Sequence, residues 1–223
     1  MNEPEENPWR SPERIFSEIS PRLADTEEEN FRWGLRKVAD GVVTAIIGNL
    51  LLVSLCALVL TDAWAVGDGT DYVILLALGV FAFGVAGCLA CLWCPRNAVP
   101  EGKLLVACTL MMPILLGWFF GAGIVMGCLA WDIFLARLVW WSAERSDDRK
   151  RRLMVILLLG TDIALIIMLA AGFFYLRMRL LEMPEIHIAK VVLILLAARA
   201  ILQIVVMVGI RRAILEMLTF DEP

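Results

Sequence analysis

Apolar runs of about 17–25 residues, the length that crosses a bilayer as a helix, recur along this 223-residue chain between short charged clusters. Hydrophobic residues make up 60% of the chain and the mean hydropathy is +0.77, whereas soluble domains are about 45–50% apolar. The pattern predicts an all-α, polytopic transmembrane bundle. It excludes a soluble enzyme, a nucleic-acid-binding protein and a disulfide-stapled secreted domain.

One apolar run is too long for a single crossing. Leu104–Trp141 holds 38 residues and would measure about 57 Å as one helix, against a hydrocarbon core of about 30 Å. We therefore expect a hairpin that turns at Gly121-Ala122-Gly123, because glycine accepts the backbone angles of a tight turn. The predicted fold then has six spans, at about residues 42–60, 72–93, 104–120, 124–141, 153–176 and 191–210.

The distribution of basic residues favours the hairpin. With six spans, twelve Lys and Arg residues of the loops and flanks lie on the inner side and three on the outer side. With a single span over 104–141 the numbers are eight and seven. Because inner loops carry an excess of Lys and Arg, we expect six spans with both termini in the cytoplasm. Pro113 is a contrary feature, since it should kink the third span.

The segment ahead of the first span is polar and acidic. Residues 1–37 contain nine acids, six bases and four prolines, a composition too polar to bury a core. The leading residues are acidic and no apolar stretch precedes Gly41, so we expect no cleavable signal peptide. The predicted organisation is a cytoplasmic arm over 1–40 that binds a protein partner, a transmembrane domain over 41–212 and a cytoplasmic tail over 213–223.

Two helix signals occur within the arm. Thr26-Glu27-Glu28-Glu29 has the form of a capping box. It predicts a helix over about 27–40 that lies on the membrane surface or runs straight into the first span. A shorter helix is expected to start at Ser11-Pro12-Glu13 and to end at Pro21.

Residues 7–12 read Asn-Pro-Trp-Arg-Ser-Pro. This stretch resembles the Asn-Pro-x-x-Ser-Pro opening of many uncharacterised bacterial multi-spanning membrane proteins. The resemblance implies a protein of the bacterial cytoplasmic membrane and implies nothing about activity.

Polar side chains inside the apolar runs form one candidate layer. Four spans place a polar residue within about one helical turn of the same depth, and a fifth residue follows on the last span: Asn49, Asp132, Asp162, Arg199 and Gln203. Arg137 sits nearer the inner headgroups. An ionisable group at such depth costs about 2.5–3.5 kcal/mol on insertion.

Two interpretations of this layer compete. In the structural one, Asp162 and Arg199 form a neutralised pair that fixes helix register, and Asp132 bonds to Asn49, Gln203 or a protonated partner. In the other, the layer is an ion or proton site with Asp132 or Asp162 as the titrating carboxylate and Arg199 as counter-ion. Because the layer contains two acids and one central base, one carboxylate has no basic partner.

The remaining reactive side chains favour packing over chemistry. All six cysteines lie within or at the ends of apolar runs, and Gly84/Cys88, Gly87/Cys91, Gly117/Gly121 and Gly123/Gly127 are small-xxx-small pairs of the kind that let helices approach closely. His187 is the lone histidine, so a bis-histidine haem and a histidine-rich zinc site are excluded. We expect no cofactor, no metal and no enzymatic activity.

The sequence predicts a non-enzymatic membrane subunit or scaffold whose partners are the lipid bilayer and a protein bound by the arm. The alternative is a small cation- or proton-coupled transporter or channel that uses the Asp/Arg layer.

Overall fold

The structure is a computed structural model that describes residues 12–61, 69–116, 122–143, 153, 155–160, 162–164, 166–167 and 185–220. Side chains are described from residue 26 onward, except at 115–116, 122, 124, 143, 185–189 and 220. Its helices are α1 (Pro12–Leu60), α2 (Gly69–Cys91), α3 (Gly102–Leu116), α4 (Ala122–Ala143) and α6 (Glu185–Phe220). A further helical segment, Val155–Ala164, follows α4 and precedes α6 along the chain. No strand occurs in these described ranges, so the predicted all-α class is confirmed.

Some predicted features lie outside the described residues. These are residues 7–11 of the Asn-Pro-x-x-Ser-Pro stretch, the last part of the predicted span 153–176, the pair Gly117/Gly121 and the final residues 221–223.

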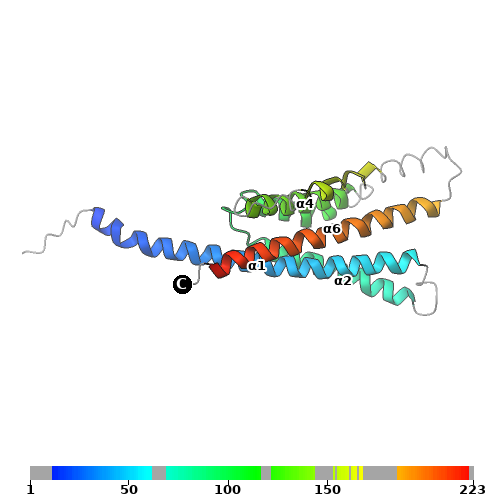
Figure 1. The fold of residues 1–223 in the computed structure, drawn as a ribbon, viewed down its shortest axis with the longest axis horizontal. Coiled ribbons are helices and arrows are strands. Elements are labelled where there is room, and N and C mark those ends of the chain that lie inside the picture. The colour runs from blue at the N-terminus through cyan, green and yellow to red at the C-terminus, as the bar shows by residue number, and fades with distance from the viewer. Residues whose placement is uncertain are drawn as a thin grey trace, which may run out of the picture.

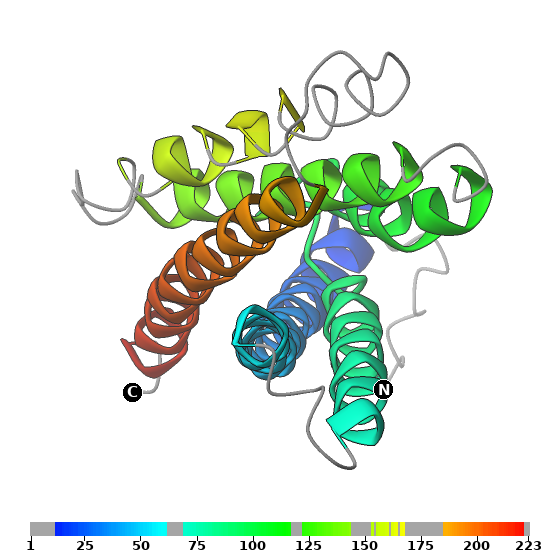
Figure 2. The same ribbon diagram turned by 90° about the vertical axis from the view of Figure 1, so that its right-hand side faces the viewer.

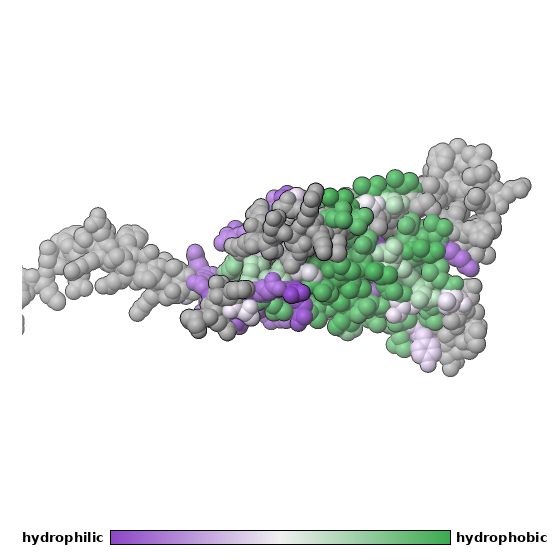
Figure 3. Space-filling view, in the orientation of Figure 1, coloured by the Kyte–Doolittle hydropathy of each residue, from purple (hydrophilic) through white to green (hydrophobic). Residues whose placement is uncertain are grey.

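Within the described ranges, four helices are long and apolar enough to cross a bilayer. They contain the stretches Thr26–Leu60, Thr70–Cys91, Val125–Ser142 and Lys190–Thr219. Gly102–Ile114 and Val155–Ala164 are shorter apolar helices. Apolar side chains cover the middle of the molecular surface, with hydrophilic residues gathered toward the end where α6 finishes (Figure 3). This distribution suits a chain whose middle is solvated by lipid.

The long apolar run forms two helices rather than one. A Cβ atom built on Gly127 of α4 would lie 3.0 Å from the carbonyl oxygen of Thr109 and 3.1 Å from the ring of Pro113, both in α3. Gly102, at the start of α3, instead faces Phe134, later in α4. These contacts run in opposite directions along the two helices, so α3 and α4 are antiparallel neighbours, as the predicted hairpin requires.

Two of the three residues of the predicted turn, Ala122 and Gly123, belong to α4. The third, Gly121, lies outside the described residues. Pro113 lies inside α3 without ending it. Its ring fills the space above Gly127, where a larger residue would clash.

Helix α1 is continuous over 49 residues, or about 74 Å. The prediction that a separate short helix ends at Pro21 is therefore wrong. A proline removes one backbone hydrogen bond, and the helix continues beyond it toward the capping-box residues. Of the two alternatives for residues 27–40, the structure has the one in which the helix runs straight into the first span. Its N-terminal part projects beyond the other helices (Figure 1).

Helices α1 and α2 form an antiparallel pair along a seam of small residues. Gly34, Gly41 and Gly48 recur every seven residues on α1. A Cβ atom on Gly41 would lie 2.8 Å from both the Gly87 carbonyl oxygen and the Cys91 thiol sulfur. We call these contacts the glycine seam. The predicted packing of Gly87 and Cys91 against a neighbouring helix is confirmed.

Aromatic side chains close the end of the bundle at which the apolar part of α1 begins. Trp33 of α1 and Trp93, just after α2, meet edge to face with centroids 5.0 Å apart. The ammonium group of Lys37 lies 5.7 Å from the centroid of the Trp33 ring. Phe31 meets Trp141 of α4 at 6.4 Å. Aromatic side chains that have an apolar body and one edge in contact with water are typical of membrane–water interfaces.

Helix α6 packs along α1, which packs along α2, while α3 packs along α4. Smaller contacts join α2 to α3 and α6 to α4. Helix α4 and the segment Val155–Ala164 lie side by side (Figures 1 and 2). The direct contact between α4 and α6 is much smaller than that between α1 and α2. The C-terminal end of α6 and the N-terminal part of α1 lie toward the same end of the molecule (Figure 1).

Candidate functional site

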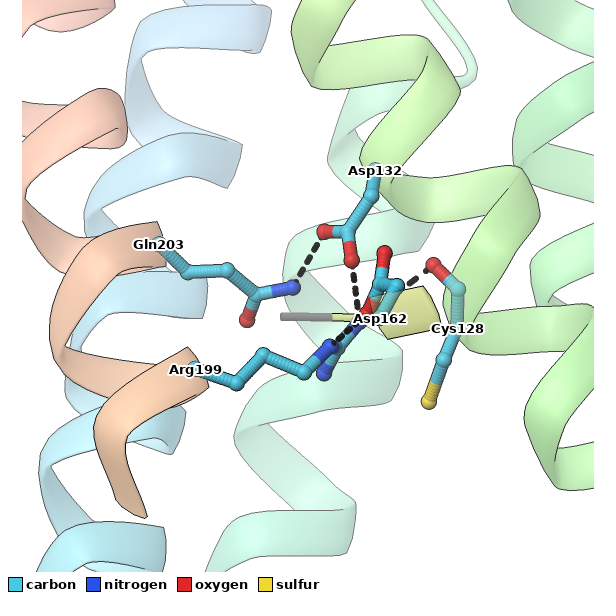
Figure 4. A network of polar contacts seen from close by, with 5 residues as sticks. All are labelled: Cys128, Asp132, Asp162, Arg199 and Gln203. Carbon is cyan, nitrogen blue, oxygen red and sulfur yellow. Dashed lines mark hydrogen bonds and ion pairs between the residues drawn. The ribbon is translucent and has the colours of Figure 1, made fainter. Parts of the chain in front are cut away.

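Three helices bring polar side chains together in the interior of the molecule. Asp132 comes from α4, Asp162 from the segment Val155–Ala164, and Arg199 and Gln203 from α6 (Figure 4). Arg199 and Gln203 are four residues apart, so they share one face of α6. Their side chains reach the same acid from neighbouring turns. We call these four residues the Asp–Arg cluster.

Arg199 is the centre of the Asp–Arg cluster. Its Nε donates to Oδ1 of Asp162 at 2.5 Å, and its Nη2 donates to Oδ2 of Asp132 at 2.5 Å. Nη2 also donates to the carbonyl oxygen of Cys128 at 3.4 Å. Gln203 Nε2 donates to the second oxygen of Asp132. One guanidinium therefore connects α6 to α4 and to the segment Val155–Ala164.

The Asp–Arg cluster is buried. The exposed fraction is 0% for Asp132, 3% for Asp162, 5% for Arg199 and 2% for Gln203. Charged bonds are strong in such a setting, because water does not screen them. Removing one partner is correspondingly costly, because a bare charge remains.

The Asp–Arg cluster is nearly but not fully satisfied. Both oxygens of Asp132 accept hydrogen bonds, and Oδ1 of Asp162 accepts one. Oδ2 of Asp162 is buried and has no hydrogen-bond partner among the described residues. The free oxygen belongs to a group with two acids and one base, so the formal charge is −1 when both aspartates are ionised.

The structure brings four of the five sequence-predicted layer residues together and leaves Asn49 out. The Asn49 amide donates to the carbonyl oxygen of Ala45, one turn earlier in α1, at 3.1 Å. Of the alternative partners expected for Asp132, Gln203 is confirmed and Asn49 is not. Arg137 is exposed on α4, away from the cluster. Equal depth in a bilayer did not ensure contact, because each helix also has to turn the residue inward.

The structural interpretation also needs one correction. It paired Arg199 with Asp162 and gave Asp132 other partners, whereas the guanidinium bridges both acids. Arginine has donors on several edges of a planar fork and can bind two carboxylates at once. The bond to the Cys128 carbonyl had no sequence signal, because every residue carries that acceptor.

The cysteines give no sign of a chemical centre. All six are free, and the described residues contain no group of three or more side chains that could hold a metal ion. Burial raises the pKa of Cys94, which follows α2, to about 12. That thiol is therefore uncharged at neutral pH and a poor nucleophile.

Comparison with family models, with curated proteins and with solved structures finds no match to this chain.

Proposed function

We propose that this protein is a non-enzymatic subunit or scaffold of the bacterial cytoplasmic membrane, and that its N-terminal arm binds a protein partner. The observation that carries the proposal is the continuity of α1 from Pro12 to Leu60. An arm in the same helix as a membrane span holds its partner at a set distance and orientation from the bilayer. A flexible linker would give neither.

The polar interior supports the same proposal. The Asp–Arg cluster joins helices to each other by direct bonds. Asp132 has both oxygens occupied by α6 donors. A cluster used in this way positions α4 and the segment Val155–Ala164 on α6.

The arm is tested by deletion. Full-length protein and a variant lacking residues 1–25 are purified from the native membrane in mild detergent, and the co-purifying proteins are compared. We expect the truncated protein to remain monodisperse and to lose one specific partner. Deletion of residues 221–223, at the other end of the chain, is the matched control and should retain that partner. Unchanged association after loss of the arm contradicts the proposal.

Six spans with both termini in the cytoplasm remain our proposal for the topology. The antiparallel pairs α1/α2 and α3/α4 support it. So does the placement of the C-terminal end of α6 near the N-terminal half of α1, because an even number of crossings returns the chain to its starting side (Figure 1). The excess of Lys and Arg on the inner side of this topology supplies the orientation.

Single cysteines test the topology with a membrane-impermeant maleimide on intact cells. The sites are Glu28, Thr61 and Arg212, which are exposed, in a background whose native cysteines are replaced by alanine. Cysteine at Thr61 should react from outside, and cysteine at Glu28 or Arg212 only after permeabilisation. Labelling of positions 28 and 212 from opposite sides would require an odd number of spans.

A second candidate function is a small cation- or proton-coupled transporter or channel. It is favoured by one observation: two buried acids share one guanidinium, and Asp162 Oδ2 is unbonded among the described residues. Its test is pH-dependent flux in proteoliposomes. Flux that Asp132→Asn or Asp162→Asn abolishes in a folded protein supports transport, whereas the absence of flux in the wild type removes this candidate.

A further inference from the structure

The Asp–Arg cluster has unequal numbers of positive and negative groups. Asp132 and Asp162 both bond to Arg199, and these three side chains are almost fully buried. A salt bridge leaves no net charge when one acid meets one base, but here a second carboxylate remains. A net charge buried in protein at membrane depth costs several kcal/mol unless it is neutralised.

Among the residues that the structure describes, the groups that face the cluster supply no second positive charge. From α4 these are Asp132 and Cys128, and from α6 they are Arg199 and Gln203. Cys88 of α2 lies near Cys128, and a thiol supplies no positive charge. Within the described residues, the excess negative charge therefore has no counter-ion on the protein.

One oxygen is available for a ligand. Asp162 Oδ2 has no hydrogen-bond partner among the described residues, although the other oxygen of the same carboxyl group bonds to Arg199. A metal cation needs several oxygen ligands at once, and the cluster offers one unbonded carboxylate oxygen. A proton needs only one.

We propose that the Asp–Arg cluster binds one proton, held by the Asp132–Asp162 carboxyl pair, in which Asp162 Oδ2 has no hydrogen-bond partner among the described residues. The proton comes from the medium and converts one carboxylate into a carboxylic acid, so the buried group becomes neutral. This site goes beyond the scaffold function and does not depend on flux. It couples the attachment of α4 and the segment Val155–Ala164 on α6 to pH.

The direct test is infrared spectroscopy of the full-length protein in lipid nanodiscs at pH 7. A protonated carboxyl group has a carbonyl stretch that a carboxylate lacks, and labelling with ¹³C-aspartate moves the band of an aspartic acid. The other eight aspartates lie outside the predicted spans. We expect one label-sensitive carboxylic-acid band in the wild type. No such band overturns the proposal without any need for a variant.

Charge balance makes a sharper prediction for the variants. In Asp162→Asn or Asp132→Asn, one carboxylate faces one guanidinium, so the remaining acid should ionise and the band should disappear in both. Asp71→Asn, at an exposed position near the start of α2, is the matched control and should keep the band. A band that persists in both cluster variants overturns the proposal.

Stability supplies an independent readout. The folded cluster holds a proton that the unfolded aspartates release at neutral pH, so wild-type stability should fall as pH rises through the point of proton loss. The two single asparagine variants should lack this component. If sodium removes the band and raises the melting temperature at constant pH and ionic strength, the ligand is a metal cation and the proposal is wrong. Deleting residues 1–25 should leave the band unchanged, which separates this test from that of the arm.

Discussion

The glycine seam and the Asp–Arg cluster attach helices to each other in opposite ways. Along the seam, α1 and α2 approach so closely that a single Cβ atom on Gly41 would meet the α2 backbone at 2.8 Å. At the cluster, α6 contacts α4 over a much smaller region and holds it through charged side chains. The seam allows close approach because glycine has no side chain, whereas the cluster is held by polar side chains that reach from one helix to another.

The difference follows from the solvent. Lipid is as apolar as leucine, so apolar burial adds little to helix association inside a bilayer. Two sources of attraction remain, namely close van der Waals contact and polar bonds. The seam uses the first and has no room for added volume. The cluster uses the second, and it is sensitive to the loss of a charge and to pH.

The largest expected loss of stability comes from replacing Arg199, the centre of the cluster. Arg199→Met leaves two buried carboxylates without their donor, and loss of one member of a buried ionic group costs about 3–5 kcal/mol. Unfolding of the purified protein by denaturing detergent measures the loss. Arg211→Met is the matched control, because Arg211 is exposed on the same helix. Equal losses for the two variants would show that the cluster does not hold α4 on α6.

Adding volume to the seam should have a smaller effect of different origin. Gly41→Ala places a methyl group against the Gly87 carbonyl and the Cys91 sulfur, and overpacking of this kind costs about 1–3 kcal/mol. Gly84→Ala is the control, because its new Cβ atom would meet nothing within 4 Å. The same unfolding assay compares them. A seam in which both substitutions are equally harmless would not be close-packed.

The smallest expected losses of stability come from replacing Gln203 and Asn49, two amides that the sequence analysis assigned to one polar layer. Gln203→Ala removes a donor to Asp132 across two helices, and such interhelical bonds are worth about 0.6 kcal/mol on average and up to about 1.7 kcal/mol. Asn49→Ala removes only a bond to its own helix. We expect a measurable loss for the first and a smaller loss for the second. A larger loss of stability for Asn49→Ala than for Gln203→Ala would show that Asn49 belongs to the polar layer.

Part of the fold could be predicted because a bilayer restricts which residues can lie inside it and in what lengths. Long apolar runs specify helices, and residues 104–141 were too long for one crossing, so a reversal was required. The depths of Asp132, Asp162 and Arg199 came from counting residues along helices of fixed rise. Proline was a less reliable guide, because Pro21, which was expected to end a helix, lies inside α1.

Composition, periodicity and spacing along the chain thus predicted the helical class, the candidate spans and the position of each ionisable residue along its helix, because these are properties of one helix at a time. Which faces meet is a property of several helices together, and it became visible only in the folded arrangement. Packing turned Asn49 toward its own helix, placed Arg199 between two acids instead of one, and set Gly41 against Gly87. Each of those outcomes depends on helix rotation, which the order of the residues leaves open until the helices pack.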